Sequence, residues 1–409
     1  MDVDVEYLAS ESWDANMPAR LRWLRENDPV RWSERDRLWL VSKYEDVEYV
    51  SKHQDVFTSA HGVRPGTPKI GLIDEGEPHH TELRRLVNRG FTPRMVKALE
   101  GPFRAIVTEA IDAVAARGEC DFVREIAVPL PLKIIAEMIG IERGDFERFH
   151  QWSDAMIAGD GATDPAVLAA AGRGFVEYSA YVTRIIEDRR ANPRDDLVSI
   201  LAGAKDAGVL GRFPGADAPG VAADAQLSLA NDELIMMLVI LLVAGNETTR
   251  NAISGGMQLL IEHPEERRKL IGRADLIPSA VEEMVRLVSP VHSFSRTATR
   301  DTELRGRRIR EGERVLLIYP SANRDADAFD DPDAFRVERN PQHLGFGVGS
   351  HFCLGANLAR MEMRIAFEEL LRRLPDMTYA GAGPVIQPAA LVRSCVEMKV
   401  RFTPERRAA

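Results

Sequence analysis

The segment from Asn231 to Glu262 constrains the fold of this chain more than any other. Its first three residues, Asn-Asp-Glu, provide an N-cap and an acidic first turn, and Pro264 follows its end, so the pattern predicts one long helix. The run Leu234–Gly245, LIMMLVILLVAG, is apolar on every face, and such a helix has to be buried on all sides. Because the run is shorter than the roughly 20 residues that span a bilayer, we predict a helix through the centre of a globular molecule.

Shorter helices and a few strands are predicted on both sides of this segment. Helical patterns extend over Met17–Glu26, Thr81–Val87, Pro93–Arg117, Leu132–Ile139, Arg143–Ala158, Gly174–Arg190, Ser279–Val288 and Asn357–Arg373. Strand-like pieces occur at Val30–Trp32, Trp39–Ser42 and Arg314–Tyr319. Residues 60–78, rich in glycine and proline, are expected to form a long functional loop, and residues 204–224 a surface excursion. The chain is therefore predicted to be mainly α with a smaller β region.

Composition excludes several classes of protein. The formal net charge of -10 does not favour binding to nucleic acid, which requires lysine and arginine to displace counterions from phosphates. Three cysteines, an odd and sparse count, argue against a disulfide framework and for a reducing compartment. The N-terminal stretch MDVDVEYLASESWD is acidic and has no apolar core, so it does not resemble a signal peptide. We therefore expect a cytoplasmic protein without a membrane span.

The stretch from Phe346 to Arg360, FGVGSHFCLGANLAR, is the most informative for chemistry. Two glycines, Gly347 and Gly349, precede Cys353, and a helix pattern begins directly after a third glycine. A cysteine at a helix N-terminus is expected to be favoured as the thiolate by backbone N–H groups and the helix dipole. The glycines allow a flat ligand to approach the backbone closely.

Cys353 has no second cysteine or histidine at metal-ligand spacing, which argues against a structural zinc site. A lone thiolate suits haem iron, to which it donates electron density that promotes O–O cleavage. The alternative is a buried inert cysteine, the usual state of a free cysteine. We expect that state for Cys120 and Cys395, which lack comparable surroundings.

FGVGSHFCLG resembles the haem-binding loop of the cytochrome P450 family, and further elements of that family follow in order from about residue 70 to the end. Length alone suggests two or three domains. The resemblance instead implies one domain, residues 1–409, with helix-rich and sheet-rich lobes. It implies haem b clamped between the long helix and the loop, with Cys353 as iron ligand and Phe346, Gly347 and Gly355 at the cofactor.

The long helix contains the polar sequence Ala244-Gly245-Asn246-Glu247-Thr248-Thr249. From the residues alone, a kinked helix is a sufficient reading, since glycine costs roughly 1 kcal/mol in a helix and a threonine hydroxyl can bond back to a carbonyl. The resemblance implies that Ala244 and Gly245 leave room for dioxygen. It also implies that Glu247 and Thr248 are the acid–alcohol pair that delivers protons, with glutamate where many members have aspartate.

Two further sets of charged residues match positions of the family. Glu283 and Arg286, three apart on one helix face, match its Glu-x-x-Arg element, and Arg339 matches the arginine that completes a buried network holding the cysteine loop. By itself such a pair is usually solvated. His80, Arg84, Arg296 and His351 match the residues that bind the haem propionates. Taken singly, each of these four is equally readable as a surface charge or a core histidine.

The expected substrate pocket is apolar and therefore suits a hydrophobic small molecule. It is lined by Ile70, Leu72, Val239, Val243, Val291, Phe294, Leu391 and Val392. LLVAGNETTRNAISGG and HLGFGVGSHFCLGANLAR are most similar to bacterial family members that hydroxylate sterols and methyl-branched lipids, while terpenoids, fatty acids and macrolides stay open. His292 and Arg393 either meet a polar group of the substrate or point away.

Electrons are expected from separate proteins, because the chain has no flavin or NAD fingerprint and no iron–sulfur cysteine set. The resemblance implies a ferredoxin and an NAD(P)H-dependent ferredoxin reductase, with O2 as co-substrate. The stretch TELRRLVNRGFTPRMVK is locally basic and is expected to bind an acidic ferredoxin, although charge runs are often only solvated. Its surface cations are Arg85, Arg89, Arg94 and Lys97, and Arg360 and Arg364 are expected to extend the patch.

The predicted function is that of a haem-dependent monooxygenase. A peroxide-driven peroxygenase and a non-catalytic haem-thiolate sensor are the alternatives. The intact pair of Glu247 and Thr248 counts against both, since the peroxygenases usually depart from this pair and a sensor needs no proton route.

Overall fold

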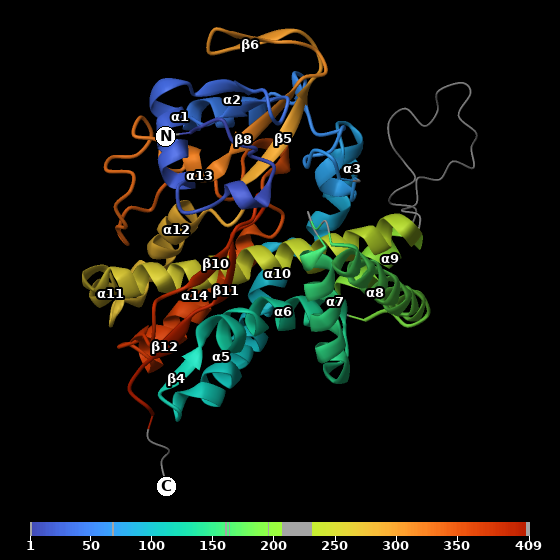
Figure 1. Ribbon diagram of the computed structural model, residues 1–409. Helices are drawn as coiled ribbons and strands as arrows, with labels where there is room; N and C mark the ends of the chain where they lie inside the picture. Colours follow the sequence, from blue (N-terminus) through green and yellow to red (C-terminus); the bar gives the residue numbers. More distant parts are fainter. Residues whose placement is uncertain are drawn as a thin grey trace.

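The computed structural model describes residues 2–67, 69–159, 162, 164–194, 196–206 and 231–405 (Figure 1). The helices are α1 Met17–Asn27, α2 Tyr44–Lys52, α3 His79–Val87, α4 Pro93–Ala98, α5 Glu100–Ala115, α6 Pro129–Ile139, α7 Phe146–Ala158, α8 Pro165–Ala191, α9 Leu197–Asp206, α10 Asn231–Glu262, α11 Pro264–Leu270, α12 Ile277–Val288, α13 Tyr319–Ala322 and α14 Ala356–Arg373. The strands are β1 Val30–Ser33, β2 Leu38–Val41, β3 Phe57–Thr58, β4 Glu119–Asp121, β5 Ser293–Ala298, β6 Thr302–Leu304, β7 Arg307–Ile309, β8 Arg314–Ile318, β9 Thr378–Tyr379, β10 Val385–Gln387, β11 Ser394–Glu397 and β12 Lys399–Arg401.

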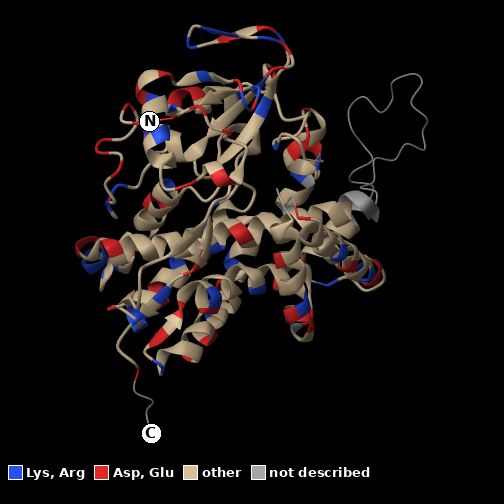
Figure 2. Ribbon diagram, in the orientation of Figure 1, with Lys and Arg blue, Asp and Glu red and all other residues tan. Residues whose placement is uncertain are grey.

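The long helix α10 has the predicted bounds and runs across the middle of the molecule (Figure 1). It contacts α6, α7, α8, α12 and α14, and its apolar side chains join one large core with theirs. Figure 2 shows charged residues mostly on the outer helices and loops, with few on the ribbon of α10. The prediction of a buried central helix is therefore confirmed.

A five-stranded sheet forms the second part of the molecule, in the order β1-β2-β8-β5-β3. β2 runs parallel to β8, with Trp39 opposite Val315, and the other neighbouring strands are antiparallel. β8 is buried on both faces, which explains its continuous run of branched apolar residues. The predicted fold, mainly α with a smaller β region, is confirmed.

Several element predictions need correction. The helix expected over Pro93–Arg117 is divided into α4 and α5 at Leu99, because Pro102 lacks an N–H and is suited to a first turn. α8 begins at Pro165 rather than Gly174, with the Asp164 side chain accepting a hydrogen bond from Ala166 N. The helical stretch expected from Arg143 begins as a short 3-10 turn before α7. α9 was not predicted, although Asp196 caps it by accepting from Ser199 N at 2.8 Å.

Most of the surface excursion expected over residues 204–224 lies outside the described residues. Across the part of the chain that is described, no helix combines the length and the hydropathy that a bilayer crossing requires.

Candidate functional site

The loop that carries Cys353 is held by its own backbone and by α2. Cys353 N donates to Phe346 O at 2.8 Å, which closes the loop, and α14 starts three residues later. Gly347 and Gly349 have positive φ values of 67° and 78°, a region in which side chains are strained. A Cβ atom on Gly349 would also lie 2.6 Å from Ser51 O of α2, so this glycine lets the loop dock on that helix.

The acidity of Cys353 is set by opposing effects. Burial raises the pKa of its thiol, while the Gly355 N–H and the charges of Arg84 and Arg360 act in the lowering direction. Burial prevails in the protein alone, although the Gly355 N–H acts in the direction expected for a cysteine before a helix. A bound metal cation reverses this balance, because a coordinated thiol loses its proton. Among the described residues, no three His, Cys, Asp or Glu side chains are gathered to hold a metal.

Two histidines stack beside this loop. The rings of His80 and His351 lie 3.9 Å apart at an interplanar angle of 29°. His80 Nδ1 is 3.1 Å from Glu77 Oε1, whereas its buried Nε2 has no partner in the structure. His351 Nε2 is 3.1 Å from Ser59 Oγ, and burial lowers the pKa of His351 to about 2, helped by the nearby charge of Arg296.

Two arginines join the two histidines in a group of nitrogen donors with few acceptors. Arg296 is buried on β5, its Nη1 donates only to the adjacent Ser295 carbonyl at 2.8 Å, and its Nε has no partner. Arg84 of α3 donates to Phe352 O at 2.6 Å, beside the cysteine. Buried donors without partners are costly unless an acceptor binds there. The group therefore fits the two carboxylates of haem b, and Cys353 fits its iron.

On α10, the sequence 244–249 makes the expected local bond. Thr248 Oγ1 donates to Ala244 O at 2.6 Å, and Ala244 is exposed at this point of the helix. Gly245 instead faces α6, where a Cβ atom would lie 2.6 Å from Ile135 Cδ1. Close packing of two helices is therefore sufficient to explain this glycine.

Glu247 is buried and held by two residues that the sequence analysis did not single out. Arg250 Nη2 lies 2.6 Å from Glu247 Oε2, and Asn251 Nδ2 donates to Glu247 Oε1 at 2.8 Å. Burial raises the pKa of Glu247, and Arg250 and Asn251 oppose that shift. Arg250 and Asn251 follow Glu247 by three and four residues on one helix, and this spacing is the sequence signal that predicts both contacts. Arg250 also reaches toward Asp154 of α7, at 3.8 Å.

Glu283, Arg286 and Arg339 form one buried network. Arg286 binds both carboxylate oxygens of Glu283, at 2.7 and 2.8 Å, and Arg339 Nε lies 2.9 Å from Glu283 Oε1. Arg286 also donates to the carbonyls of Asn323, Pro332 and Ala334. The network thus joins α12 to the segment that leads toward the cysteine loop.

The expected pocket residues come together in two groups. A Cβ on Gly71 would be 3.5 Å from Ile240 Cδ1, so Ile70 and Leu72 lie near the part of α10 that carries Val239 and Val243. Val291 forms a β-bridge with Val392, and His292 N donates to Leu391 O at 2.8 Å. Phe294 stands next to this bridge on β5, edge-on to Tyr319 at 6.1 Å.

Loop 62–74 connects the two groups. Ser295 of β5 donates through its N–H to Val63 O at 2.7 Å, which joins the start of the loop to the sheet. The Asp74 carboxylate accepts from Val63 N at 2.8 Å and from Ile70 N at 2.7 Å, which ties the loop to itself. The loop therefore lies between β5 and α10.

His292 and Arg393 make contacts within the protein. The His292 ring stacks on Trp13 with centroids 4.2 Å apart and planes 5° from parallel, and burial lowers the pKa of His292 to about 4. Arg393 donates to Gln258 Oε1 of α10 at 2.6 Å. Of the two possibilities left open for these side chains, the contacts favour an orientation away from the substrate.

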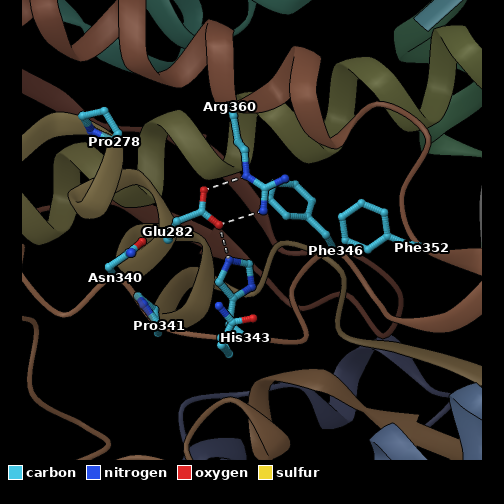
Figure 3. Close-up of a pocket in the computed structure, with 9 residues that line it drawn as sticks. Pro278, Glu282, Asn340, Pro341, His343, Phe346, Phe352 and Arg360 are labelled. Atoms are coloured by element: carbon cyan, nitrogen blue, oxygen red, sulfur yellow. Dashed lines mark hydrogen bonds and ion pairs between the residues drawn. The ribbon is translucent and has the colours of Figure 1, made fainter. Parts of the chain in front are cut away.

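Arg360 and Arg364 do not extend the basic patch as expected, because carboxylates neutralise them. Arg360 forms a bidentate pair with Glu282 at 2.7 and 2.8 Å and stacks on Phe346, as Figure 3 shows at a pocket of about 290 Å³. Glu282 is also 3.2 Å from His343, and these partners lower the pKa of Glu282 to about 2 despite burial. Arg364 pairs with Glu100 at 2.9 Å and with Glu368 at 3.0 Å.

Arg85, Arg94 and Lys97 differ from these arginines. All three are exposed on α3 and α4, and no ion pair joins any of them to another described residue. The side chain of Arg89 lies outside the described residues. Arg85, Arg94 and Lys97 thus form a cationic surface on α3 and α4 without an ion-pair partner among the described residues. α3 contacts the cysteine loop through Arg84.

Comparison with known proteins identifies the family. The cytochrome P450 family profile matches residues 175–375. The chain is 38% identical to a steroid C26-monooxygenase of Mycolicibacterium smegmatis over 387 residues, covering 94% of this chain and 92% of the relative. It is 41% identical to a methyl-branched lipid omega-hydroxylase of Mycobacterium tuberculosis over 356 residues, covering 83% and 78%.

Solved structures agree. A Bacillus megaterium cytochrome P450 in complex with testosterone superposes with a TM-score of 0.83 at 32% identity, covering 96% of this chain and 99% of that one. A Mycobacterium marinum cytochrome P450 in complex with pseudoionone gives a TM-score of 0.86 at 32% identity, covering 98% and 99%. The chain therefore belongs to the cytochrome P450 family of monooxygenases, whose cofactor is haem b.

Proposed function

We propose that this monooxygenase hydroxylates a C–H bond of a sterol, a terpenoid or a fatty-acid-like lipid in the cytoplasm, as a single domain over residues 1–409. The observation that carries the proposal is an acid–alcohol pair on α10 together with two groups of apolar side chains, one of which lies near Ile240 of the same helix. Relatives named as a steroid C26-monooxygenase and a methyl-branched lipid omega-hydroxylase support the substrate class.

The cofactor is held by residues from both lobes. Haem b, ligated by the Cys353 sulfur, supplies the iron at which dioxygen is reduced. Arg84, Arg296, His80 and His351 bind the two propionates, which provide the acceptors that the buried Nε of Arg296 and Nε2 of His80 lack in the protein alone. Phe346, Gly347 and Gly355 would contact the cofactor beside Cys353, with Phe346 fixed by the cation–π contact from Arg360.

Protons are delivered from the α10 side. Burial raises the pKa of the Glu247 carboxyl, and this direction favours a group that holds a proton for delivery. The Thr248 hydroxyl donates a hydrogen bond to Ala244 O and lies beside the exposed Ala244, where it helps to deliver protons. Ala244, whose small side chain is exposed at this point of α10, leaves room for dioxygen, whereas Gly245 packs against Ile135 of α6.

The substrate is bound with few polar contacts. Ile70, Leu72, Val239 and Val243 form one wall, and Val291, Phe294, Leu391 and Val392 form the other. Because burial of apolar surface yields about 25 cal/mol per Å², a lipid-sized ligand gains most of its affinity from these walls. His292 and Arg393, engaged by Trp13 and Gln258, do not contribute.

Electrons come from a ferredoxin that is reduced by an NAD(P)H-dependent reductase. The exposed cations Arg85, Arg94 and Lys97 are the proposed contact surface for an acidic ferredoxin, since they have no carboxylate partner among the described residues. Their position on α3 and α4, beside the cysteine loop, favours electron transfer over a short distance.

Substitution of Thr248 tests the catalytic assignment. Thr248→Ala removes the hydroxyl that holds the proton-donating group, so electrons are expected to be released as hydrogen peroxide instead of entering product. Product formed per NADH, measured with a surrogate ferredoxin and reductase, should fall severalfold while the spectral shift on substrate binding persists. A mutant as fully coupled as the wild type contradicts the assignment, and full activity driven by peroxide alone in the wild type favours the peroxygenase.

A spectral screen tests the substrate class. Sterols, methyl-branched lipids, terpenoids, fatty acids and macrolides are titrated into the holoenzyme, and the spin-state change of the iron is recorded. Binding is expected for the first four classes, with hydroxylation of an apolar carbon identified by mass spectrometry. Exclusive binding of polar macrolides contradicts the proposed substrate class.

A further inference from the structure

Asn251 is fully buried on α10 and makes contacts in two directions. Its Nδ2 donates to Glu247 O at 2.9 Å and to Glu247 Oε1 at 2.8 Å. Its Oδ1 accepts from Cys395 N of β11 at 2.9 Å. One amide side chain therefore joins the acid of α10 to a strand 144 residues further along the chain.

β11 forms a hairpin with β10 and follows the substrate-facing segment directly. Val392 and Leu391 lie three and four residues before Cys395, and Val392 bridges to Val291. Arg393 N also donates to Pro290 O at 2.8 Å, which fixes this segment against the residues before β5. Only three or four residues of backbone therefore separate Val392 and Leu391 from the Cys395 N–H, from which Asn251 accepts a hydrogen bond.

Two charged groups and one thiol lie near the contacts that Asn251 makes with Glu247 and β11. Arg250 of α10 pairs with Glu247 at 2.6 Å, and Asp154 of α7 lies beyond Arg250 at 3.8 Å. On the β11 side the nearest titratable group is the Cys395 thiol, whose pKa burial raises. Among the described residues, Asn251 is the uncharged side chain that donates to the Glu247 carboxylate. A buried amide with satisfied bonds is rigid, because breaking either one leaves a polar group without a partner.

We propose that Asn251 is a positioning residue that fixes the Glu247 carboxylate and anchors the β10–β11 hairpin at once, so that the substrate-facing segment and the proton-delivering acid move together. This role presupposes the proposed function of Glu247 in proton delivery. It follows that a substrate in contact with Leu391 and Val392 holds the Glu247 carboxyl in the position from which it delivers protons. A substrate that fits poorly leaves the carboxyl out of position, so that electrons are lost as peroxide.

Two variants test separately whether Asn251 positions the Glu247 carboxylate and whether it anchors the β10–β11 hairpin. Asn251→Asp keeps an oxygen that accepts from Cys395 N but removes the donor to Glu247, and two adjacent carboxyl groups cannot both ionise readily. Asn251→Ala loses both contacts. Asn246→Asp is the matched control, because Asn246 is a buried asparagine of the same helix that donates to Ser153 at 3.0 Å instead of to Glu247.

The holoenzymes are compared by two measurements: substrate dissociation constants from the spin-state shift, and product per NADH across pH 6–9. Asn251→Asp is expected to keep the dissociation constant within about twofold while the alkaline limb of the coupling profile moves up by about one pH unit, roughly a tenfold change in protonation. Asn251→Ala is expected to weaken substrate binding severalfold as well. Asn246→Asp should leave both measurements near the wild-type values.

The result that overturns the proposal is a wild-type pH profile in Asn251→Asp, or wild-type substrate affinity in Asn251→Ala. Glu247→Gln distinguishes this failure from a failure of the proposed function. If Glu247→Gln uncouples electron use but Asn251→Asp does not, Asn251 has no positioning role and Glu247 keeps its own. If Glu247→Gln itself stays coupled, the assignment of Glu247 is wrong.

Discussion

At the scale of single residues, burial dominates the chemistry of this protein. Cys353, Glu247 and Glu362 all have pKa values raised by burial, even though the first two also have nearby cations that act in the opposite direction. Charged forms of such groups persist only where a cation or a set of donors offsets the loss of hydration. Each of these three buried groups therefore needs either a positive partner or a bound proton.

The cysteine requires a metal, and its replacement makes this visible. In Cys353→His an imidazole replaces the anionic sulfur as the ligand of iron. The reduced carbonyl complex of the wild type is expected to show the red-shifted Soret band of thiolate ligation, and the variant should lose that band. An unchanged spectrum means that another residue is the ligand, and Cys120→Ser, at a buried cysteine on β4, is the control expected to keep it.

Glu362 requires a proton. It is buried on α14, its Oε2 has no partner in the structure, and its pKa lies well above the usual 4.5. The folded state therefore keeps this proton at pH values where the unfolded state has released it, so stability falls as pH rises above 4.5, by up to about 1.4 kcal/mol per pH unit until the folded pKa is passed.

Glu362→Gln removes this titration but keeps the size and shape of the side chain. Urea unfolding of both holoenzymes between pH 4.5 and 9 should show the variant gaining stability relative to the wild type as pH increases. A stability difference that stays constant over the whole range contradicts the prediction of a buried neutral carboxyl.

At the scale of elements, close approach explains the glycines better than flexibility does. Gly245 lets α10 approach Ile135 of α6, and Gly349 lets the cysteine loop approach Ser51 O of α2. Gly347 has a positive φ like Gly349, but its nearest neighbour, His351 O, is 3.7 Å from the position of a Cβ atom. The two loop glycines therefore separate the effect of backbone strain from that of docking.

Gly349→Ala is expected to cost more than Gly347→Ala. Both variants place a side chain at positive φ, which costs roughly 1–2 kcal/mol, but only the first also forces a methyl group within 2.6 Å of a carbonyl oxygen. Thermal unfolding and haem content measure the difference. Gly349→Ala should lose roughly 2 kcal/mol or more and bind haem poorly, and equal losses in the two variants would show that docking on α2 is unimportant.

At the scale of the whole molecule, charge is distributed so that most cations are paired. Arg104, Arg360 and Arg373, for example, each bind carboxylates on neighbouring elements. The exposed cations Arg85, Arg94 and Lys97 of α3 and α4 have no ion pair with a described residue, although the whole chain has a net charge of -10. Long-range attraction between such a surface and an acidic partner acts mainly on association rate and is screened over about 8 Å at physiological salt.

Reduction by an acidic ferredoxin should therefore slow steeply as salt is added. Arg85→Glu is expected to slow it severalfold further at low salt while leaving the substrate dissociation constant unchanged. Arg308→Glu is the control, since Arg308 is exposed on β7 and paired with Asp301 at 2.7 Å. Equal reduction rates in the two variants, or rates insensitive to salt, place the docking surface elsewhere.

The central helix and the cysteine loop were predictable because their signals are local. The apolar run of α10 and its acidic start lie within a few turns, and the glycines and Cys353 lie within ten residues of one another. The family resemblance adds the expected set of distant partners, such as Arg339 for Glu283, because it carries information from other folded chains. Local patterns did not predict every helix. α9 was missed because it is short, and its apolar positions are explained only by its packing against α8.

The sequence by itself determined the helices with strong periodicity, the position of Cys353 on a glycine-containing loop before a helix, and the position of Glu247 and Thr248 on α10. Only the tertiary structure decided which side chains neutralise Arg360 and Arg364, where His292 and Arg393 turn, and that Asn251 joins Glu247 to β11. The physical reason is range. Helix periodicity and turn chemistry depend on neighbours within about four residues, whereas an ion pair or a buried hydrogen bond depends on packing that brings together residues far apart in the chain.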